Sequence, residues 1–478
     1  MLFNSIDFAI FLPLVFALYW LIPKGKLRLQ NILVIVASYV FYGWWDYRFL
    51  SLILVSTLVD YGVGLSLKNL QDNAKRKAFL WLSILVNIGL LGFFKYYNFF
   101  VDNFVQAFSF FGREIQPNTL NIILPVGISF YTFQTLSYTI DVYRRKLEPT
   151  KDIFAFAAFV SFFPQLVAGP IERATNLLPQ FYERRTFNYT KAVDGLRQIL
   201  WGLFKKIVIA DNCAFFVNTI FENEQSYSGS TLLLGAVFFA FQIYGDFSGY
   251  SDIAIGTSRL FGFNLKQNFA FPYFSRDIAE FWRRWHISLS TWFRDYVYIP
   301  LGGSRVSKML QVRNVFIIFL ISGFWHGANW TFIFWGLLNA LCFLPLLLLK
   351  RNRSNIEIVA QGKLLPSLKD LLAMSVTFGI TVLAWIFFRA ENLEHAISYL
   401  TSMVDASLFS LPEIRPTFLM VLIVLFMIIE WLGRQYEYAI EKMWFNKPSW
   451  VRLMCYYIIA IIIFLYGGKE QEFIYFQF

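Results

Sequence analysis

Apolar runs of roughly membrane-spanning length recur along the whole chain, and they restrict its fold more than any other feature. A helix needs about 20 mostly apolar residues to cross a bilayer. Hydrophobic residues make up 57% of the chain and charged residues only 15%, whereas a soluble domain needs about 25% charged residues to cover its surface. The sequence therefore predicts an all-α polytopic membrane protein with one membrane-embedded domain over 1–478. The candidate spans are 6–22, 31–45, 48–67, 78–98, 121–142, 192–220, 231–250, 314–324, 330–349, 371–389, 415–433 and 452–467.

Three of these runs predict tilted or broken crossings. The runs 31–45 and 314–324 are short, and Lys205 and Lys206 interrupt the run 192–220. Because a spanning segment can tilt or kink to match the bilayer, we expect about 11 to 12 transmembrane helices in all.

Charge alternates between the loops and predicts the orientation. Segment 251–313 holds nine basic residues against four acidic ones, and 350–369 holds five against one. The loops 222–230 and 390–412 are acidic instead. Because loops rich in Lys and Arg stay in the cytoplasm, we expect both termini to lie outside it.

Two long segments, 152–191 and 251–313, are too polar for lipid and too apolar for free loops, and proline and glycine interrupt both. Broken backbone at membrane depth is tolerated where it is buried in protein or lines a watery cavity. We therefore expect re-entrant or interfacial segments around a cytoplasmic vestibule. Amphipathic helices lying on the membrane surface are the alternative.

Several kinds of site are not supported by the sequence. The three cysteines lie in apolar runs, so neither a disulfide framework nor a cysteine-rich metal site is indicated. No metalloprotease, P-loop, nucleophile-elbow or dinucleotide motif is present. The formal net charge of +11 is better explained by cytoplasmic loops facing anionic membrane lipid than by nucleic acid. We expect no metal, no nucleic acid and no tightly bound cofactor.

His326 is the first candidate catalytic residue. It lies in Gly323-Phe-Trp-His-Gly-Ala-Asn-Trp330, between two apolar runs. Ionisable groups at that depth are costly and usually functional, and burial favours a neutral imidazole that can accept a proton. The flanking glycines leave room for a ligand. The alternative is a packed histidine bonded to a carbonyl group. We expect Trp325 and Asn329, in the same motif, to contact substrate.

His286 is the second candidate, in a stretch that predicts an amphipathic helix, Glu280-Phe-Trp-Arg-Arg-Trp-His-Ile-Ser-Leu-Ser-Thr-Trp292. Arg283 and Arg284 suit phosphate groups by charge and fork geometry. An interfacial helix anchored by tryptophan is equally compatible with the pattern. The third histidine, His395, is expected to be a solvated surface residue.

Two carboxylates and the C-terminal tail complete the candidates. Asp246 and Asp252, in Tyr244-Gly-Asp-Phe-Ser-Gly-Tyr-Ser-Asp252, are expected to pair with arginines of the next segment. The tail 473–478 is mostly aromatic, whereas chain ends are normally polar and frayed. We expect it to occupy a groove or tunnel, where the Tyr475 hydroxyl could reach a buried base.

Taken together, these motifs resemble the membrane-bound O-acyltransferase (MBOAT) family. The resemblance rests on the Tyr244–Asp252 run, the arginine–histidine block around His286, the turn Tyr298-Ile-Pro-Leu-Gly-Gly303 and the Gly323–Trp330 motif. Within that family the chain is most similar to the membrane subunits that O-acetylate alginate in bacteria. The stretch Pro164-Gln-Leu-Val-Ala-Gly-Pro-Ile-Glu172 also looks like that subgroup.

The resemblance implies an O-acyltransferase of a bacterial cytoplasmic (inner) membrane, with a central tunnel and an essential histidine at His326. It implies a second histidine, His286, on the cytoplasmic side of the tunnel, and an acyl-carrying tyrosine at Tyr475. Acetyl-CoA would be the donor substrate. An extracytoplasmic acetyltransferase of the serine-hydrolase type would pass the acetyl group to a polysaccharide.

Two other functions remain compatible with the same residues. A transporter of an envelope precursor could use the histidines as a proton relay. A related acyltransferase could carry another acyl group, such as D-alanyl, because the sequence does not give the width of the tunnel.

Overall fold

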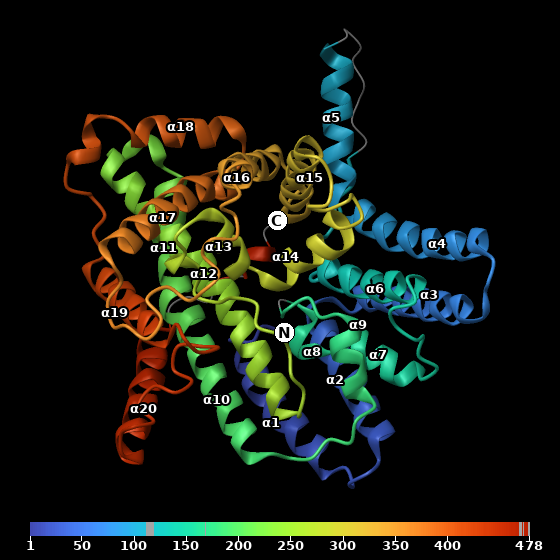
Figure 1. The fold of residues 1–478 in the computed structure, drawn as a ribbon. Coiled ribbons are helices and arrows are strands. Elements are labelled where there is room, and N and C mark those ends of the chain that lie inside the picture. The colour runs from blue at the N-terminus through green and yellow to red at the C-terminus, as the bar shows by residue number, and fades with distance from the viewer. Residues whose placement is uncertain (111–118, 168, 468–470, 472, 477–478) are drawn as a thin grey trace. The chain divides into compact units, whose positions relative to one another are not determined.

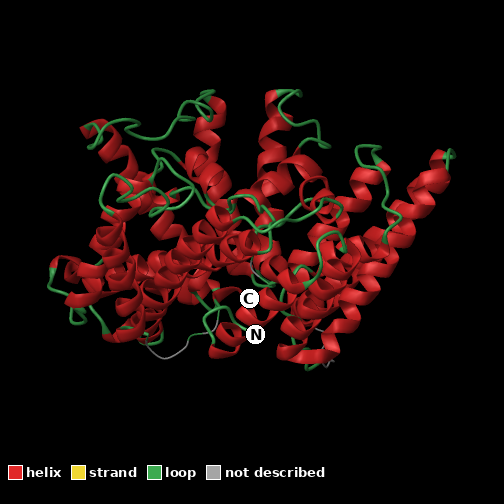
Figure 2. Ribbon diagram, turned by 90° about the horizontal axis from the view of Figure 1, so that it is seen from below, coloured by secondary structure: helices red, strands yellow, loops and turns green. Residues whose placement is uncertain are grey.

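The computed structural model describes residues 1–110, 119–167, 169–467, 471 and 473–476, so positions 477 and 478 of the predicted tail lie outside it. Over these ranges the chain is helical and forms no strand (Figure 2). It divides into two compact units (Figure 1). Unit 1 comprises Met1–Ala192 and Thr257–Lys266, and unit 2 comprises Val193–Gly256 and Gln267–Phe478.

The predicted multi-pass membrane protein is confirmed, because each of the twelve apolar runs overlaps a helix. Within the described ranges, six helices are long and apolar enough to cross a membrane, and four shorter apolar helices accompany them. The exact number of crossings stays a prediction. The six are Leu27–Asn69, Asn73–Ser109, Gly229–Leu260, Lys308–His326, Trp330–Leu348 and Leu368–Arg389; the shorter ones are Ile6–Leu21, Ile153–Leu166, Thr417–Gly433 and Ser449–Leu465.

Unit 1 packs its helices around a buried carboxylate, Asp60, which is fully shielded from solvent. Its oxygens accept hydrogen bonds from Ser83, from Asn87 Nδ2 at 2.8 Å and from Thr139 Oγ1 at 2.8 Å. Such hydrogen bonds offset the cost of burying a polar group in an apolar core. The helices of unit 1 are α1 (Ile6–Leu21), α2 (Leu27–Asp46), η1 (Tyr47–Phe49), α3 (Leu50–Asn69), α4 (Asn73–Leu91), η2 (Gly92–Tyr96), α5 (Tyr97–Phe110), α6 (Ile128–Tyr143), α7 (Ile153–Ser161), α8 (Phe163–Leu166), α9 (Ala174–Leu177) and η3 (Leu178–Phe181).

Unit 2 contains all the candidate catalytic residues. The helices α10 (Tyr189–Leu203) and α12 (Gly229–Leu260) have residues in both units. The others in unit 2 are η4 (Phe204–Ala210), α11 (Asp211–Phe221), η5 (Glu224–Ser226), η6 (Pro272–Phe274), α13 (Ile278–Arg284), α14 (Ile287–Phe293), η7 (Arg294–Tyr298), α15 (Lys308–His326), α16 (Trp330–Leu348), α17 (Leu368–Arg389), α18 (Leu393–Met403), η8 (Ala406–Phe409), α19 (Thr417–Gly433), α20 (Ser449–Leu465) and η9 (Ile474–Phe476).

The segments 152–191 and 251–313 contain short helices joined by extended chain, as their prolines and glycines predict. The helices α7 and α13, for example, have nine and seven residues, far fewer than a crossing needs. Many of their side chains are buried within the protein. Whether these segments re-enter the membrane stays a prediction.

The helices α15 and α16 approach each other closely at two glycines. A methyl group on Gly323 would collide with the carbonyl oxygen of Phe332, and one on Gly336 with that of Phe319. Small residues at a crossing let membrane helices pack backbone against backbone. The crossing lies less than one turn from the end of α15, where His326 is the last helical residue.

Candidate functional site

His326 lies in an aromatic pocket of unit 2. Its side chain is buried, with 3% of the residue exposed. The ring centroid lies 5.2 Å from that of Trp335, 5.3 Å from that of Phe388 and 5.6 Å from that of Tyr475. An apolar surrounding excludes water and strengthens any polar interaction formed inside it.

The C-terminal tail occupies the other side of this pocket. Phe473 and Ile474 are almost completely buried, so the described start of the tail docks into the protein. The Tyr475 ring lies 4.5 Å from Phe247, between centroids. Its hydroxyl oxygen is buried and has no hydrogen-bond partner in the described chain. Burial, and to a lesser degree the charge of Asp246, hold the pKa of this hydroxyl above its usual value, so the phenol needs a base to react.

His286 is connected to the same pocket through aromatic rings. Its centroid lies 4.6 Å from Phe247, edge to face, and 6.1 Å from Trp325. Phe247 contacts Tyr475, and Trp325 contacts His326 at 4.9 Å. The structure thus brings together all three predicted catalytic residues, although only His326 and Tyr475 are in direct ring contact.

Asn268, which the sequence patterns did not single out, determines which nitrogen of His286 carries the proton. Its Oδ1 lies 3.2 Å from His286 Nδ1 and accepts the Ser288 main-chain N–H at 3.2 Å. Its Nδ2 donates to Ser251 Oγ at 3.1 Å. Because Oδ1 must be an acceptor, Nδ1 carries the proton and Nε2 is the basic nitrogen. Burial lowers the pKa of His286 below its usual value, so the neutral ring persists at neutral pH.

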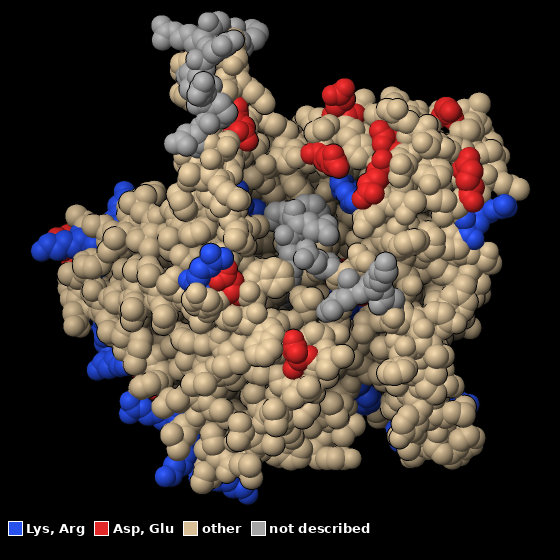
Figure 3. All heavy atoms as spheres, turned by 180° about the vertical axis from the view of Figure 1, so that it is seen from behind, with Lys and Arg blue, Asp and Glu red and all other residues tan. Residues whose placement is uncertain are grey.

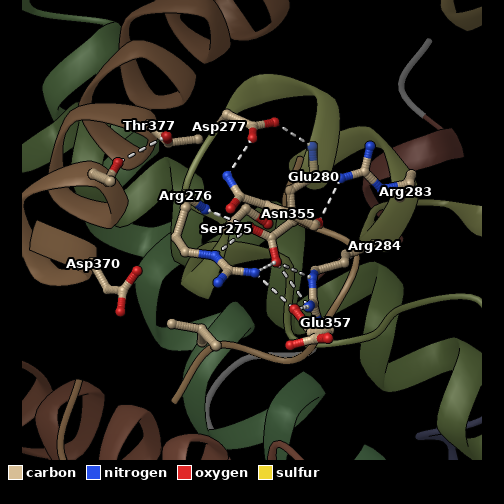
Figure 4. A network of polar contacts seen from close by, with 12 residues as sticks. Ser275, Arg276, Asp277, Glu280, Arg283, Arg284, Asn355, Glu357, Asp370 and Thr377 are labelled. Carbon is tan, nitrogen blue, oxygen red and sulfur yellow. Dashed lines mark hydrogen bonds and ion pairs between the residues drawn. The ribbon is translucent and has the colours of Figure 1, made fainter. Parts of the chain in front are cut away.

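Arg283 and Arg284 are bonded within the protein. Arg283 donates to the carbonyl oxygens of Asn352 and Asn355, at 2.8 and 2.7 Å. Arg284 forms an ion pair with the buried carboxylate of Glu280 at 2.8 Å. Figure 4 shows this network, in which the arginines hold the chain segment after α16. The predicted role of the two arginines in phosphate binding stays a prediction.

A cavity of about 360 Å³ lies next to this segment. It has three cations in its lining, Arg294, Lys350 and Arg353, and we call it the basic cavity. Sequence reasoning missed these cations because they come from two separate segments. Side chains of α14 and α15, among them Leu289, Phe319 and Ser322, also line it, together with residues of α13 and α16.

A second cavity, of about 460 Å³, lies beyond His326 and includes Gly327 in its lining; we call it the Gly327 cavity. Arg389 and Glu391 also face it. Ser322, in the lining of the basic cavity, lies about one helical turn before His326, and Gly327, in the lining of the Gly327 cavity, directly follows it. His326 is thus next to residues that line each cavity.

The two remaining motif residues have structural contacts. Asn329 caps α16, accepting the Thr331 N–H at 3.0 Å, and donates to the Glu391 carbonyl at 2.7 Å. It also lines the Gly327 cavity, whereas Trp325 packs against both His286 and His326. Substrate contact by either residue stays a prediction.

The prediction that Asp246 and Asp252 pair with arginines was wrong. Asp246 pairs with Lys206 at 2.7 Å, and Asp252 pairs with Lys205 at 2.6 Å. Both lysines lie in η4, a wide helical turn that packs against α12, where Gly249 has no side chain to obstruct the approach. The lysines that interrupt an apolar run are thus neutralised within it.

His395 differs from the expected solvated residue, because it is half-buried and its ring lies 6.3 Å from Phe221. Among the described residues, no group of histidine, cysteine and carboxylate side chains could hold a metal ion. The three cysteines are free.

Comparisons with known proteins show which family the chain is similar to. The model of the membrane-bound O-acyltransferase family matches residues 39–387. A protein of Pseudomonas aeruginosa named probable alginate O-acetylase AlgI is 41% identical over 419 residues, covering 87% of this chain and 77% of that protein. The peptidoglycan O-acetyltransferase of Helicobacter pylori is 35% identical, covering 100% of this chain and 98% of that protein.

A more distant relative transfers a different group. The teichoic acid D-alanyltransferase of Bacillus subtilis is 27% identical, covering 58% of this chain and 71% of that protein. The family match spans the α12 carboxylates, His286, His326 and the lining of the basic cavity, and it ends before Arg389 and Glu391 of the Gly327 cavity. The chain is therefore a multi-pass membrane O-acyltransferase and belongs to the membrane-bound O-acyltransferase family.

Proposed function

We propose that the protein transfers an acetyl group from cytoplasmic acetyl-CoA to Tyr475, from which a partner passes it to a cell-envelope or secreted polysaccharide. The observation that carries this proposal is the contact between His326 and Tyr475, next to residues that line two cavities. A base, a hydroxyl nucleophile and an opening for a donor are thereby close together. The names of the relatives, an alginate O-acetylase and a peptidoglycan O-acetyltransferase, favour acetyl and a glycan.

The basic cavity suits the donor. Coenzyme A carries phosphate groups at one end, a flexible arm and the thioester at the other. The cations Arg294, Lys350 and Arg353 would bind the phosphates by charge. The arm would then extend along α15 toward Ser322, one turn before His326. Arg283 acts on this site indirectly, because it bonds the Asn352 carbonyl next to Arg353.

The chemistry follows from the surroundings of the two residues. His326 accepts the proton of the Tyr475 hydroxyl as its oxygen attacks the thioester carbonyl carbon. The new C–O bond forms and the C–S bond breaks, and the thiolate leaves with the proton that the histidine held. The product is a phenyl ester, which is activated toward a second transfer.

The second transfer takes place at the opposite opening. Figure 3 shows acidic side chains gathered over the part of unit 2 around α18, and Glu391, two residues before α18, lines the Gly327 cavity. Acidic loops are expected outside the cytoplasm, since the basic loops are retained there. An extracytoplasmic acetyltransferase with a nucleophilic serine would take the acetyl group from Tyr475, and the protein would lie in a bacterial inner membrane. The other exposed acids of this surface are Glu222, Glu394, Asp405 and Glu413.

A transporter of an envelope precursor is disfavoured, because the chain is an acyltransferase and the pocket around His326 is filled by aromatic rings. D-alanyl transfer is also less well supported, because the D-alanyltransferase relative covers a smaller share of this chain than the O-acetyltransferases.

Labelled acetyl-CoA tests the proposal directly. Purified protein given the labelled donor should retain the label on the C-terminal peptide at Tyr475. Tyr475→Phe keeps the aromatic ring and removes the nucleophile, so it should lose the label and polysaccharide acetylation. His326→Ala should also lose both, by about a hundredfold or more, as expected for a general base.

The same measurement carries its own controls. His395→Ala removes a histidine outside the pocket and should label normally, while folding of each variant is followed by thermal unfolding in detergent. If the wild-type protein takes up no label from the donor, the acyl-tyrosine step is wrong. The same conclusion follows if Tyr475→Phe protein still acetylates polysaccharide at the wild-type rate.

A further inference from the structure

The C-terminal tail is held in unit 2 by its main chain. Ile474 N–H donates to Asp246 Oδ2 at 2.6 Å, and Lys206 Nζ donates to the Gln471 carbonyl at 3.1 Å. Lys206 is 1% exposed, and it also pairs with Asp246 at 2.7 Å and with Asp211 at 2.8 Å. The buried pair Lys206–Asp246 thus bonds the main chain of the tail on both sides of Phe473, Lys206 at Gln471 and Asp246 at Ile474.

The neighbouring ion pair Lys205–Asp252 shows what is unusual about the pair Lys206–Asp246. Asp252 pairs with Lys205 at one oxygen and accepts Gln198 Nε2 at the other, at 2.9 Å. That pair is completed by a side chain of α10. Asp246 has the same arrangement, but its amide donor is the main chain of the tail. Burying a carboxylate without such a donor is unfavourable, so the tail completes the Lys206–Asp246 pair.

The contacts also fix the position of Tyr475. Phe473 packs on Tyr250 at 4.4 Å and on Phe247 at 5.9 Å, between ring centroids. Tyr475 follows one residue after the anchored amide, and its ring lies 5.6 Å from that of His326. A hydrogen bond to a main-chain group restrains the backbone itself, so it limits where the next side chain can point.

We propose that Lys206 and Asp246 are positioning residues that hold the tail by its main chain and so place Tyr475 beside His326. The proposal rests on the proposed function for the role of Tyr475, while the anchoring itself can be measured independently. Neither residue touches the acyl group, so their loss should lower kcat and leave the KM for acetyl-CoA unchanged.

Hydrogen–deuterium exchange of the purified full-length protein tests the anchoring. Asp246→Asn removes the charge that attracts the Ile474 N–H, and exchange of the C-terminal peptide should accelerate by about tenfold or more. The matched control is Asp252→Asn, which breaks the neighbouring buried pair and should leave tail exchange at the wild-type rate. Equal exchange in the two variants would overturn the proposal.

A second pair of variants leaves the buried charges intact. Ile474→Pro removes the N–H donor at the first position of η9, where proline is tolerated, whereas Ile474→Val keeps it. We expect acyl transfer to fall about tenfold or more in the proline variant, with the KM for acetyl-CoA unchanged, and to persist in the valine variant. Transfer retained in both would exclude a positioning role.

The two proposals fail in distinguishable ways. Tyr475→Phe retains every main-chain contact of the tail, so its exchange should stay slow whatever it does to acetylation. If acetylation survives in Tyr475→Phe while Asp246→Asn still releases the tail, then the acyl-tyrosine step is wrong and the anchoring is right.

Discussion

At the scale of single residues, the two candidate catalytic histidines have different surroundings. His326 is enclosed by aromatic rings, and one of them, that of Tyr475, carries a hydroxyl group. His286 instead has a fixed polar neighbour, because the Asn268 amide accepts its Nδ1–H. This bond holds the ring orientation and leaves Nε2 free of the proton.

Asn268→Asp should shift the pH dependence of acyl transfer. A carboxylate next to Nδ1–H favours the imidazolium form and raises the pKa of His286. If the neutral ring is the active form, activity is then lost at a higher pH as the solution is acidified. We expect the acid limb of kcat/KM for acetyl-CoA to move upward by about one unit or more.

Ser251→Ala is the control for this shift. It removes the Ser251 hydroxyl that accepts Asn268 Nδ2 at 3.1 Å but leaves the Asn268–His286 contact in place. Its pH profile should match that of the wild type. An unchanged acid limb in Asn268→Asp would mean that the protonation state of His286 does not limit the reaction.

At the scale of helices, the crossing of α15 and α16 determines where His326 lies. Gly323 and Gly336 let the two backbones touch. A methyl group added to either glycine would also contact the Cα atom of the other. Since His326 ends α15 three residues after Gly323, a change in the crossing moves the base relative to the tail. The position of the base thus depends on residues that never contact the substrate.

Gly336→Ala should therefore reduce activity more than the small size of the change suggests. The methyl group meets the Phe319 carbonyl, and forcing it in costs about 1–3 kcal/mol or displaces the helices. We expect a lower unfolding temperature and a loss of kcat. Gly379→Ala on α17, where no atom lies within 4 Å of the new methyl, should be neutral. Equal behaviour of the two variants would show that the crossing does not position the base.

At the scale of the whole molecule, charge distinguishes the two cavities. Cations line the basic cavity, whereas acidic side chains surround the region of α18 next to the Gly327 cavity (Figure 3). This asymmetry matches the segregation of basic and acidic loops along the sequence. It also predicts which opening attracts a polyanionic donor.

Neutralising Lys350 and Arg353 together should weaken donor binding. The double alanine variant removes two of the three cations of the basic cavity, so the KM for acetyl-CoA should rise by about tenfold with little change in kcat. Added salt should raise the KM of the wild type more than that of the variant. Lys369→Ala, in the same basic segment but outside the cavity lining, should behave as wild type; a similar rise there would point to a general surface effect.

Local sequence patterns predicted the elements well and the partners less well. The apolar runs became helices, and the aromatic tail docked, because apolar burial depends mainly on composition and spacing. The partners of Asp246 and Arg283 were not predictable in this way. Lys206 reaches Asp246 through a wide turn in another helix, and Arg283 bonds carbonyl groups about seventy residues further along the chain.

The same limit explains what was missed in the site. Asn268 lies in an irregular loop without a motif of its own, and its function is visible only through its contact with His286. The cations of the basic cavity come from η7 and from the segment after α16. Their meeting depends on tertiary packing, which residue spacing along the chain does not encode.

The aromatic rings around His326 form a partition, and this partition has an electrical consequence. If the two cavities open to opposite sides of the membrane, as the proposed orientation requires, water in each would carry the potential of its own side inward, and the membrane voltage would fall mainly across these rings. Moving one elementary charge through 100 mV involves about 2.3 kcal/mol. In the proposed cycle each acetyl group that moves outward is exchanged for one proton, which ends on the thiol of coenzyme A. No net charge crosses the partition, and the membrane potential neither drives nor opposes the transfer.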